Sequence, residues 1–342
     1  MRVGVLTAGG DAPGLNAALR AIGRSVLAQG HQLIGISDGW AGLAREFQGR
    51  EMTRADLAGI LAIGGTTLGS IRYSLDNPAD GRERVLRAIG DNLDALVAIG
   101  GDGTLSIASW LAERGAPVVG VGKTLDNDLA NTDYCIGFDT AVSVVADALD
   151  RLHTTAASHH RVLVLETMGR NTGWVATMGG LAGGADFIVI PEVPVTLNDI
   201  VTHVQSRHGR GSSFSIVVVA EGVSPEQLGG HSATERVDSL GRSVLGARGV
   251  GQFIADHLAG ATGFETRCTV LGYLQRGGSP SALDRIWATR VGAAAADLVM
   301  AGKFGMMPTV RCGEVATMPL ADSISEPHGV PDDLYRLAQR FF

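Results

Sequence analysis

The chain has 342 residues, 45% of them hydrophobic, which is enough for a large core and predicts about two domains at the usual ~150 residues each. The net charge is −7 and no basic block occurs, so neither nucleic acid nor an anionic membrane surface is an expected partner. The N-terminal residues lack the features of a signal peptide, and no window holds the roughly 20 apolar residues of a membrane span, so we expect a cytoplasmic protein.

In the first half of the chain, short apolar runs that end in glycine alternate with helix-like stretches. The expected strands with their glycine turns are residues 3–10, 95–103 and 118–122, and the expected helices are residues 16–29, 105–115 and 140–156. Strand, glycine turn and helix in repetition are typical of a parallel sheet with right-handed crossovers.

After about residue 158 the same alternation begins again. The expected strands are residues 161–170, 187–190 and 214–222, and the expected helices are residues 173–184 and 197–208. This pattern predicts a second α/β unit. No proline-rich or low-complexity linker separates the halves, so we expect two apposed domains with a ligand cleft between them. Ligands of such sheets bind at the carboxyl ends of strands, which here carry AGGD, IGGDGT, ETMGR and VVAEG.

The glycine motifs fit no common nucleotide-binding fingerprint. The turn GGDAPG, residues 9–14, could hold phosphate on its backbone N–H groups, or could be a tight turn without a ligand. The run GKT at residues 122–124 resembles the end of a P-loop, but Pro117 stands where that motif needs its first glycine. Ser106 stands where the dinucleotide fingerprint needs its third glycine. A P-loop NTPase is therefore rejected and a nicotinamide enzyme is disfavoured.

The motif GGDGT, residues 100–104, indicates phosphate chemistry. Asp102 lies between glycines, so it can approach phosphates and hold Mg²⁺, which prefers oxygen ligands. The alternative is a helix-capping aspartate with no ligand. GGDGT also occurs in NAD kinases and lipid kinases, so the motif predicts a kinase without saying which one.

The segment TLDND, residues 124–128, places two carboxylates two residues apart. One can accept the proton of an attacking hydroxyl while the other positions metal or base, as phosphoryl transfer requires. With this segment the chain resembles the phosphofructokinase family. That family carries, in this order, GGDAPG, GGT-x-LGS-x-R, GGDG, a TIDND-like segment, MGR, a glutamate-glycine strand end and LG-x-x-QRGG. The corresponding segments here begin at Gly9, Gly64, Gly100, Thr124, Met168, Glu221 and Leu271.

The resemblance implies an α/β fold of two Rossmann-like three-layer α/β/α domains with mainly parallel sheets and the active site in the cleft between them. Residues 1–138 plus about 250–300 would form a larger nucleotide-binding domain. Residues about 139–249 plus about 301–320 would form a smaller sugar-phosphate domain, and residues about 321–342 a C-terminal helical tail. The implied activity is the glycolytic, Mg²⁺-dependent transfer of the ATP γ-phosphoryl group to the 1-hydroxyl of fructose 6-phosphate.

The family's catalytic and nucleotide roles carry over to matching positions. Asp126 would be the general base and Asp102 the Mg²⁺ ligand, with Thr124 and Asp128 assisting, and Arg72 would neutralise the transferring phosphoryl group. The nucleotide site would comprise Gly10, Arg72, Tyr73, Gly101, Asp102, Gly103 and Thr104.

The sugar-phosphate site is implied in the same way. The sugar would be held by Thr124, Leu125, Asp126, Met168, Gly169, Arg170 and Glu221, with Arg170 also catalytic. Arg276, with Arg161 and Arg267, would clamp the 6-phosphate, since forked guanidinium donors suit phosphate geometry. In the family the latter two come from a neighbouring subunit, which implies a homotetramer or a homodimer.

Donor and acceptor specificity stay open at three positions. Gly103 goes with ATP in the family, whereas Lys123 matches pyrophosphate users but also occurs in ATP users that resemble the actinobacterial branch. ATP is therefore favoured and pyrophosphate is the alternative donor. Tyr273 replaces the usual histidine of LGHIQR, so another sugar phosphate such as sedoheptulose 7-phosphate is an alternative acceptor. An NAD or lipid kinase is a remote alternative.

Overall fold

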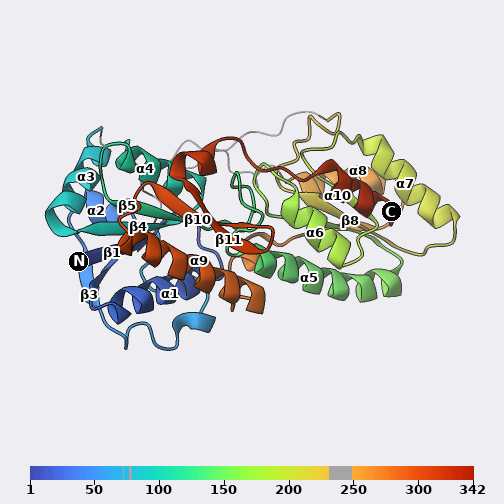
Figure 1. Cartoon of the computed structure of the whole chain (residues 1–342). Helices are drawn as coiled ribbons and strands as arrows, with labels where there is room; N and C mark the ends of the chain where they lie inside the picture. Colours follow the sequence, from blue (N-terminus) through green and yellow to red (C-terminus); the bar gives the residue numbers. More distant parts are fainter. Residues whose placement is uncertain (72, 77–78, 231–248) are drawn as a thin grey trace. The chain divides into compact units, whose positions relative to one another are not determined.

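The chain folds into two compact α/β units (Figure 1). The structure is a computed structural model and describes residues 1–71, 73–76, 79–230 and 249–342. The first unit comprises Met1–Thr140 and Arg276–His328, and the second comprises Ala141–Gln275 and Gly329–Phe342. Among the described helices, none has the length and apolar character that a bilayer span requires.

The first unit is built on a five-stranded sheet. Its strands, in spatial order, are β3 (Gly49–Met52), β2 (Gln32–Ile36), β1 (Arg2–Thr7), β4 (Ala95–Gly100) and β5 (Val118–Gly122). All neighbours are parallel except β2 and β3. The helices of this unit are α1 (Leu15–Ala28), α2 (Ala41–Ala44), α3 (Gly81–Asn92), α4 (Asp102–Ala112) and α9 (Ala282–Met300), with 3-10 turns at Ile60–Ala62 and Leu320–Ile324.

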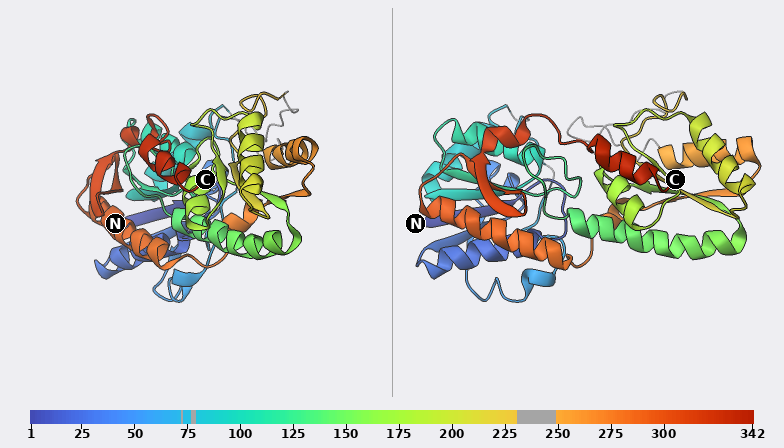
Figure 2. Two further views of the ribbon diagram at one scale, coloured as in Figure 1. Left: turned by 90° about the vertical axis from the view of Figure 1, so that its right-hand side faces the viewer. Right: turned by 45° about the vertical axis from the view of Figure 1, so that its right-hand side comes forward.

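Strand β4 supplies side chains to both faces of this sheet. Val97 and Ile99 belong to the core formed with α1 and α9, whereas Leu96 and Ala98 belong to the core formed with α2, α3 and α4. Successive side chains of a strand point to opposite faces, so one buried strand serves two cores and the unit has three layers. Helices α1 and α9 lie side by side (Figure 2).

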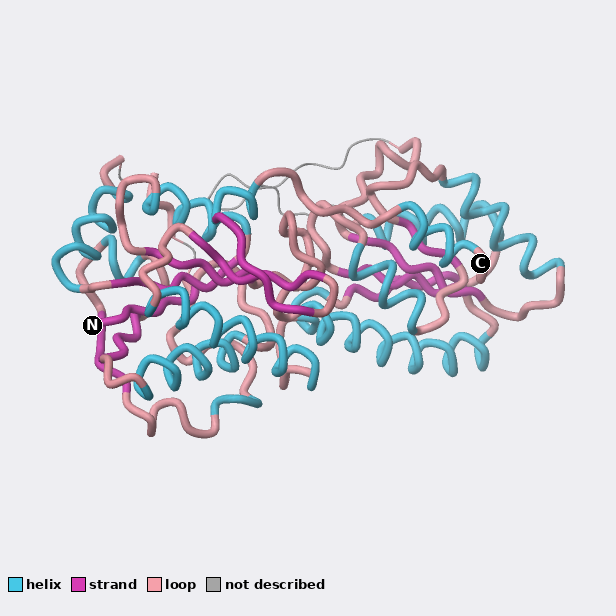
Figure 3. Tube along the Cα trace, in the orientation of Figure 1, coloured by secondary structure: helices cyan, strands magenta, loops and turns pink. Residues whose placement is uncertain are grey.

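The second unit is built on a four-stranded sheet in which all neighbours are parallel. Figure 3 draws its strands in magenta. Its strands, in spatial order, are β7 (Phe187–Val189), β8 (Ser215–Ala220), β6 (Val162–Thr167) and β9 (Thr266–Val270). Its helices are α6 (Trp174–Ala182), α7 (Leu197–Gly209), α8 (Val250–Thr262) and α10 (Asp332–Gln339), with a 3-10 turn at Gly272–Gln275; helix α5 (Phe138–His159) begins in the first unit and continues into the second. The predicted α/β fold with mainly parallel sheets is confirmed.

The compact units divide the chain differently from the predicted domains. Residues 250–275 belong to the second unit, because β9 pairs with β6. Residues 301–320 belong to the first unit, because they form the antiparallel hairpin of β10 (Met306–Arg311) and β11 (Glu314–Pro319), which packs on β5 and α9. The predicted C-terminal tail contains α10, which joins the second unit through a hydrogen bond from Tyr335 Oη to the carbonyl of Ile188 (2.6 Å).

Candidate active site

Three predicted site loops meet at one edge of the first sheet. They are residues 8–14, 101–104 and 123–128, which follow β1, β4 and β5, and these strands are parallel neighbours. The backbone N–H of Ala8 donates to the carbonyl of Ile99, and that of Lys123 donates to the carbonyl of Gly100, both at 2.9 Å. The GGDAPG turn, the GGDGT motif and the TLDND segment therefore form one cluster.

The glycine turn leaves its backbone open to a ligand. Gly9 has a φ of +82°, a left-handed conformation that favours glycine. Gly10 is exposed, and a Cβ atom there would lie 2.8 Å from Arg276 Nη1. Glycine at this position therefore allows the arginine, and equally a phosphate, to approach the main chain.

Helix α4 begins at the GGDGT motif. Asp102 is its first residue and is exposed, and Gly103 and Thr104 complete the start of the first turn. The N–H groups of a helix's first turn lack partners within the helix, and the helix dipole is positive at that end, so an anion is favoured there. This geometry suits a diphosphate beside an accessible carboxylate.

The TLDND segment is buried and held by its own hydrogen bonds. Asp126 is 4% exposed, its Oδ2 accepts a bond from Thr124 Oγ1 (3.3 Å), and its N–H donates back to that hydroxyl (3.1 Å). Asn127, at a φ of +53°, accepts a bond from the N–H of Cys135 (2.8 Å). Leu125 is buried, with the residue as a whole 1% exposed.

Lys123 and Arg276 place two cations against the glycine turn. Lys123 is 3% exposed and its ammonium donates to the carbonyl of Gly10. Arg276 Nη1 donates to the carbonyl of Asp11 at 3.0 Å. Burial, and the positive charge of Arg276, lower the pKa of Lys123 to about 8. Lys123, predicted to bear on donor specificity, therefore lies against the glycine turn, and so does Arg276.

Asp284, which sequence reasoning missed, anchors the chain just beyond the TLDND segment. Its buried carboxylate accepts bonds from Tyr134 Oη (2.7 Å), from the N–H of Gly137 (2.6 Å) and from both the N–H (2.9 Å) and the hydroxyl of Thr140. Ser281, the N-cap of α9, donates to Asp139 (2.6 Å). The starts of α5 and α9 are thereby fixed to each other, and nothing in the local sequence indicates this pairing.

In the second unit, the predicted sugar residues gather at the carboxyl ends of β6 and β8. The N–H of Arg170 donates to Glu221 Oε1 (3.3 Å), and a Cβ atom at Gly222 would lie 2.0 Å from the carbonyl of Arg170. Gln275, which sequence reasoning missed although it belongs to the QRGG motif, accepts a bond from the N–H of Met168 (2.8 Å). Met168, Gly169, Arg170 and Glu221 therefore form one group.

Arg161 and Arg267 lie at the opposite end of this sheet. Arg161 directly precedes β6, whereas Met168 directly follows it, and Arg267 is the second residue of the neighbouring β9. Six residues of strand separate the two ends by roughly 20 Å. Arg161 and Arg267 are therefore not brought to Arg170 within one sheet of one chain.

The remaining predicted site residues are Arg72, Tyr73 and Tyr273. Arg72 lies outside the described residues. The ring of Tyr73 is partly buried and carries the guanidinium of Arg45 4.9 Å from its centre. Tyr273, in place of the usual histidine, is 77% exposed.

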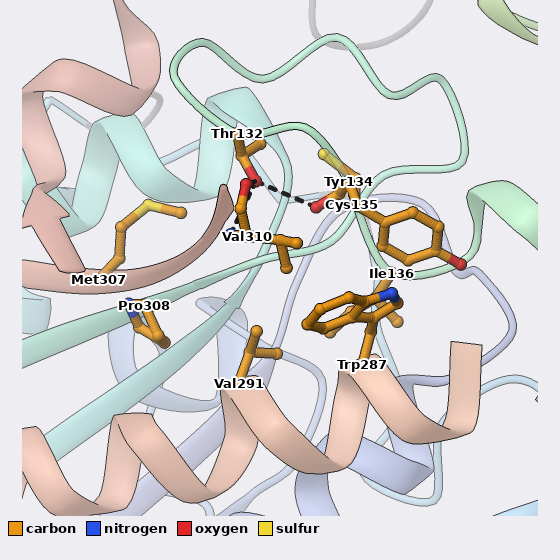
Figure 4. Close-up of a pocket in the computed structure, with 10 residues that line it drawn as sticks. Thr132, Tyr134, Cys135, Ile136, Trp287, Val291, Met307, Pro308 and Val310 are labelled. Carbon is orange, nitrogen blue, oxygen red and sulfur yellow. Dashed lines mark hydrogen bonds between the residues drawn. The ribbon is translucent and has the colours of Figure 1, made fainter. Parts of the chain in front are cut away.

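A small pocket lies in the first unit (Figure 4). It is lined by Thr132, Tyr134, Cys135 and Ile136, by Trp287 and Val291 of α9, and by Gly122, Met307, Pro308 and Val310. Its polar lining atom Thr132 Oγ1 already donates to the carbonyl of Tyr134 (3.1 Å). None of these residues belongs to the predicted site, so the pocket is a packing feature of the first unit.

The sequence and the fold were compared with known proteins. Residues 2–299 match the family described as Phosphofructokinase. The chain belongs to the phosphofructokinase family. The match confirms the predicted resemblance and removes an NAD or lipid kinase as an alternative.

Relatives within this family carry two kinds of name. An ATP-dependent 6-phosphofructokinase from Chloroflexus aggregans is 50% identical over 94% of this chain and 90% of its own. A pyrophosphate–fructose 6-phosphate 1-phosphotransferase from Amycolatopsis methanolica is 45% identical over the full length of both chains. In structure, Pichia pastoris phosphofructokinase in the T-state matches 94% of this chain with a TM-score of 0.82 and 31% identity. This chain spans only about a third (35%) of that longer one.

Proposed function

We propose that the chain transfers the γ-phosphoryl group of ATP to the 1-hydroxyl of fructose 6-phosphate. The observation that carries this proposal is the meeting of the glycine turn, the start of α4 and the TLDND segment at the ends of β1, β4 and β5. Phosphoryl transfer depends mostly on positioning and on stabilising charge, and this cluster offers backbone donors, cations and carboxylates together.

Asp126 is the proposed general base. Its hydrogen bonds with Thr124 fix the carboxylate, so that it would accept the proton of the sugar's 1-hydroxyl as that oxygen attacks the γ-phosphorus. Asp128 would assist from the same loop, whose backbone is held where the N–H of His328 donates to the carbonyl of Asp128 (2.9 Å).

Mg²⁺ fits the residues at the start of α4. In the part of the chain that the structure describes, no three His, Cys, Asp or Glu side chains are grouped as a metal cage. Mg²⁺ at a phosphoryl-transfer site characteristically uses one or two carboxylates and completes its shell with phosphate oxygens and water. Asp102 would be that carboxylate, and the ion would supply neutralisation of phosphate charge.

The sugar-phosphate roles are proposed from the second cluster and from Arg276. Met168, Gly169, Arg170 and Glu221 would hold the sugar, and Arg276 would bind its 6-phosphate. Arg161 and Arg267 would complete the clamp in a neighbouring chain, which their position at the far end of β6 and β9 supports. The active form would then be a homotetramer or a homodimer.

The proposed phosphoryl donor is ATP. Gly103 contributes no side chain at the start of α4, which leaves room for an α-phosphate, and the Chloroflexus relative is named ATP-dependent. Pyrophosphate is the alternative, because Lys123 lies inside the site and the Amycolatopsis relative is named for pyrophosphate.

The deciding experiment is a coupled assay with Mg²⁺ and fructose 6-phosphate, run in parallel with ATP and with pyrophosphate, using Asp126→Ala as the blank. Turnover with ATP alone is expected. Turnover with pyrophosphate alone would reverse the donor, and turnover with neither would direct the search to sedoheptulose 7-phosphate and Tyr273.

Gly103→Asp tests the role of Gly103 directly. A carboxylate beside the α-phosphate should lower ATP turnover by about 100-fold or more, because like charges in contact cost several kcal/mol. Pyrophosphate turnover of the same variant is the internal control. Unchanged ATP turnover would show that Gly103 does not select the donor.

A further inference from the structure

A carboxylate bridges the two arginines at the amino end of the second sheet. Glu265 Oε1 lies 2.8 Å from Arg161 Nη2 and 2.8 Å from Arg267 Nη2. The register explains this arrangement. Val162 pairs with Thr266, so Arg161 and Glu265 are also neighbours, and the N–H of Val162 donates to the carbonyl of Glu265 (3.0 Å). Arg267 is two residues beyond Glu265, so its side chain points to the same face.

The bridge leaves this cluster with half its positive charge. Two guanidinium groups and one carboxylate sum to a single positive charge where the arginines alone would carry two. The same hydrogen bonds hold the pKa of Glu265 below its usual range, with Arg161 as the main cause, so the carboxylate is ionised at neutral pH. An incoming phosphate dianion would have to compete with the Glu265 carboxylate, which is already bound to both Arg161 and Arg267.

We propose that Glu265 sets the affinity for substrate, because it competes with the sugar phosphate for Arg161 and Arg267 and so weakens the binding of that phosphate. This inference rests on the proposed function, in which these two arginines bind the 6-phosphate. The side-chain partners of Glu265 are the two arginines, and it has no part in the proposed transfer step, so we expect it to act on the affinity for substrate and not on kcat.

The alternative role, that Glu265 only holds the arginines in place, is weaker on the observed contacts. Arg267 Nη1 also donates to the carbonyl of Thr266 (3.0 Å), and Arg161 is partly buried, with its side chain 31% exposed. Without the carboxylate, Arg267 keeps this bond and Arg161 keeps its partial burial. When the negative charge of Glu265 is removed, we expect the loss of repulsion toward the phosphate to outweigh any loss of order in the two arginine side chains.

Glu265→Gln is the matched test, because glutamine keeps an oxygen that can accept from both arginines and loses only the charge. The KM for fructose 6-phosphate should fall by about threefold to tenfold, the scale of two exposed ion pairs, with kcat unchanged. The KM should also rise more steeply with salt, since the cluster then carries the full charge of both arginines.

Asp147→Asn is the control. It removes one negative charge from the same unit, where Asp147 pairs with Arg151 on the exposed face of α5, and it should leave the KM unchanged. A direct readout is the binding of inorganic phosphate by calorimetry, which should tighten in Glu265→Gln and be lost again in the double variant with Arg267→Ala.

The proposal is overturned if the wild-type enzyme turns over fructose 6-phosphate and the KM of Glu265→Gln is equal or higher. An equal fall in Asp147→Asn would also overturn it, because net charge alone would then explain the effect. Failure of the wild type to use fructose 6-phosphate is a different result, which counts against the proposed function itself. The phosphate calorimetry does not depend on turnover and still decides between competitor and support.

Discussion

Two charged groups, one in each unit, differ in how they hold charge. In the first unit, Lys123 and Asp126 are buried, 3% and 4% exposed, and are fixed by backbone and hydroxyl partners. In the second unit, Arg267 and Glu265 are open to solvent, with side chains 62% and 44% exposed. Water screens the group of Arg267 and Glu265 and does not screen the buried group of Lys123 and Asp126. Changing a charge should therefore have a large effect in the buried group and a modest effect in the exposed one.

Asp126→Asn should show the largest effect on the buried side of this comparison. The amide keeps the shape of the side chain but cannot accept the hydroxyl proton, so kcat should fall by about 100-fold to 10,000-fold with little change in KM. The coupled assay measures both. Asp91→Asn, on the exposed face of α3, is the control and should keep full activity. Retained kcat in Asp126→Asn would contradict the role of general base.

Asp284→Ala should cause the largest loss of stability. The variant leaves the buried donors of Tyr134, Gly137 and Thr140 without their acceptor, and we expect the free energy of unfolding to fall by about 3–5 kcal/mol. Urea denaturation measures this loss. Asp297→Ala, at an exposed position of the same helix α9, should change stability by less than about 0.5 kcal/mol. Equal effects of the two variants would show that the junction of α5 and α9 contributes no special stability.

Lys123→Met tests whether the buried ammonium limits stability as a function of pH. With a folded pKa of about 8 and an ordinary value of 10.5, both states are protonated below pH 8, so the cost of burying the charge is fully present there. Between those values the unfolded chain holds the extra proton, so wild-type stability should rise with pH relative to Lys123→Met, by about 3 kcal/mol over the window. Parallel denaturation curves across this window measure the difference. A constant difference would mean that Lys123 keeps an ordinary pKa in the folded chain.

The smallest expected effect belongs to the exposed group of Arg161, Arg267 and Glu265, where Glu265→Gln should lower the KM for fructose 6-phosphate by about threefold to tenfold. If the fold-change in KM of Glu265→Gln exceeded the fold-change in kcat of Asp126→Asn, the contrast between a buried and a solvent-screened group would be wrong.

The sequence by itself determined strands β1 and β4 to β8 with the helices that follow β1 and β4 to β7, the family and the membership of the first cluster. It did not mark β2, β3, β9, β10 and β11, nor helices α2, α3, α8 and α9. Apolar runs that end in glycine mark a strand and its turn directly. Because neighbouring parallel strands bring their carboxyl ends together, the sequence alone could group Gly10, Asp102 and Asp126. The motif LGYLQRGGSP likewise marked Arg276 as a site residue.

Only the tertiary structure decided which distant segments join. The placement of residues 250–275 depends on the pairing of β9 with β6, and Asp284 meets Thr140 across more than a hundred residues of chain. The bridge from Glu265 to Arg161 likewise depends on strand register. Such contacts leave no local pattern, because side-chain periodicity records which face of an element is buried and not which partner buries it.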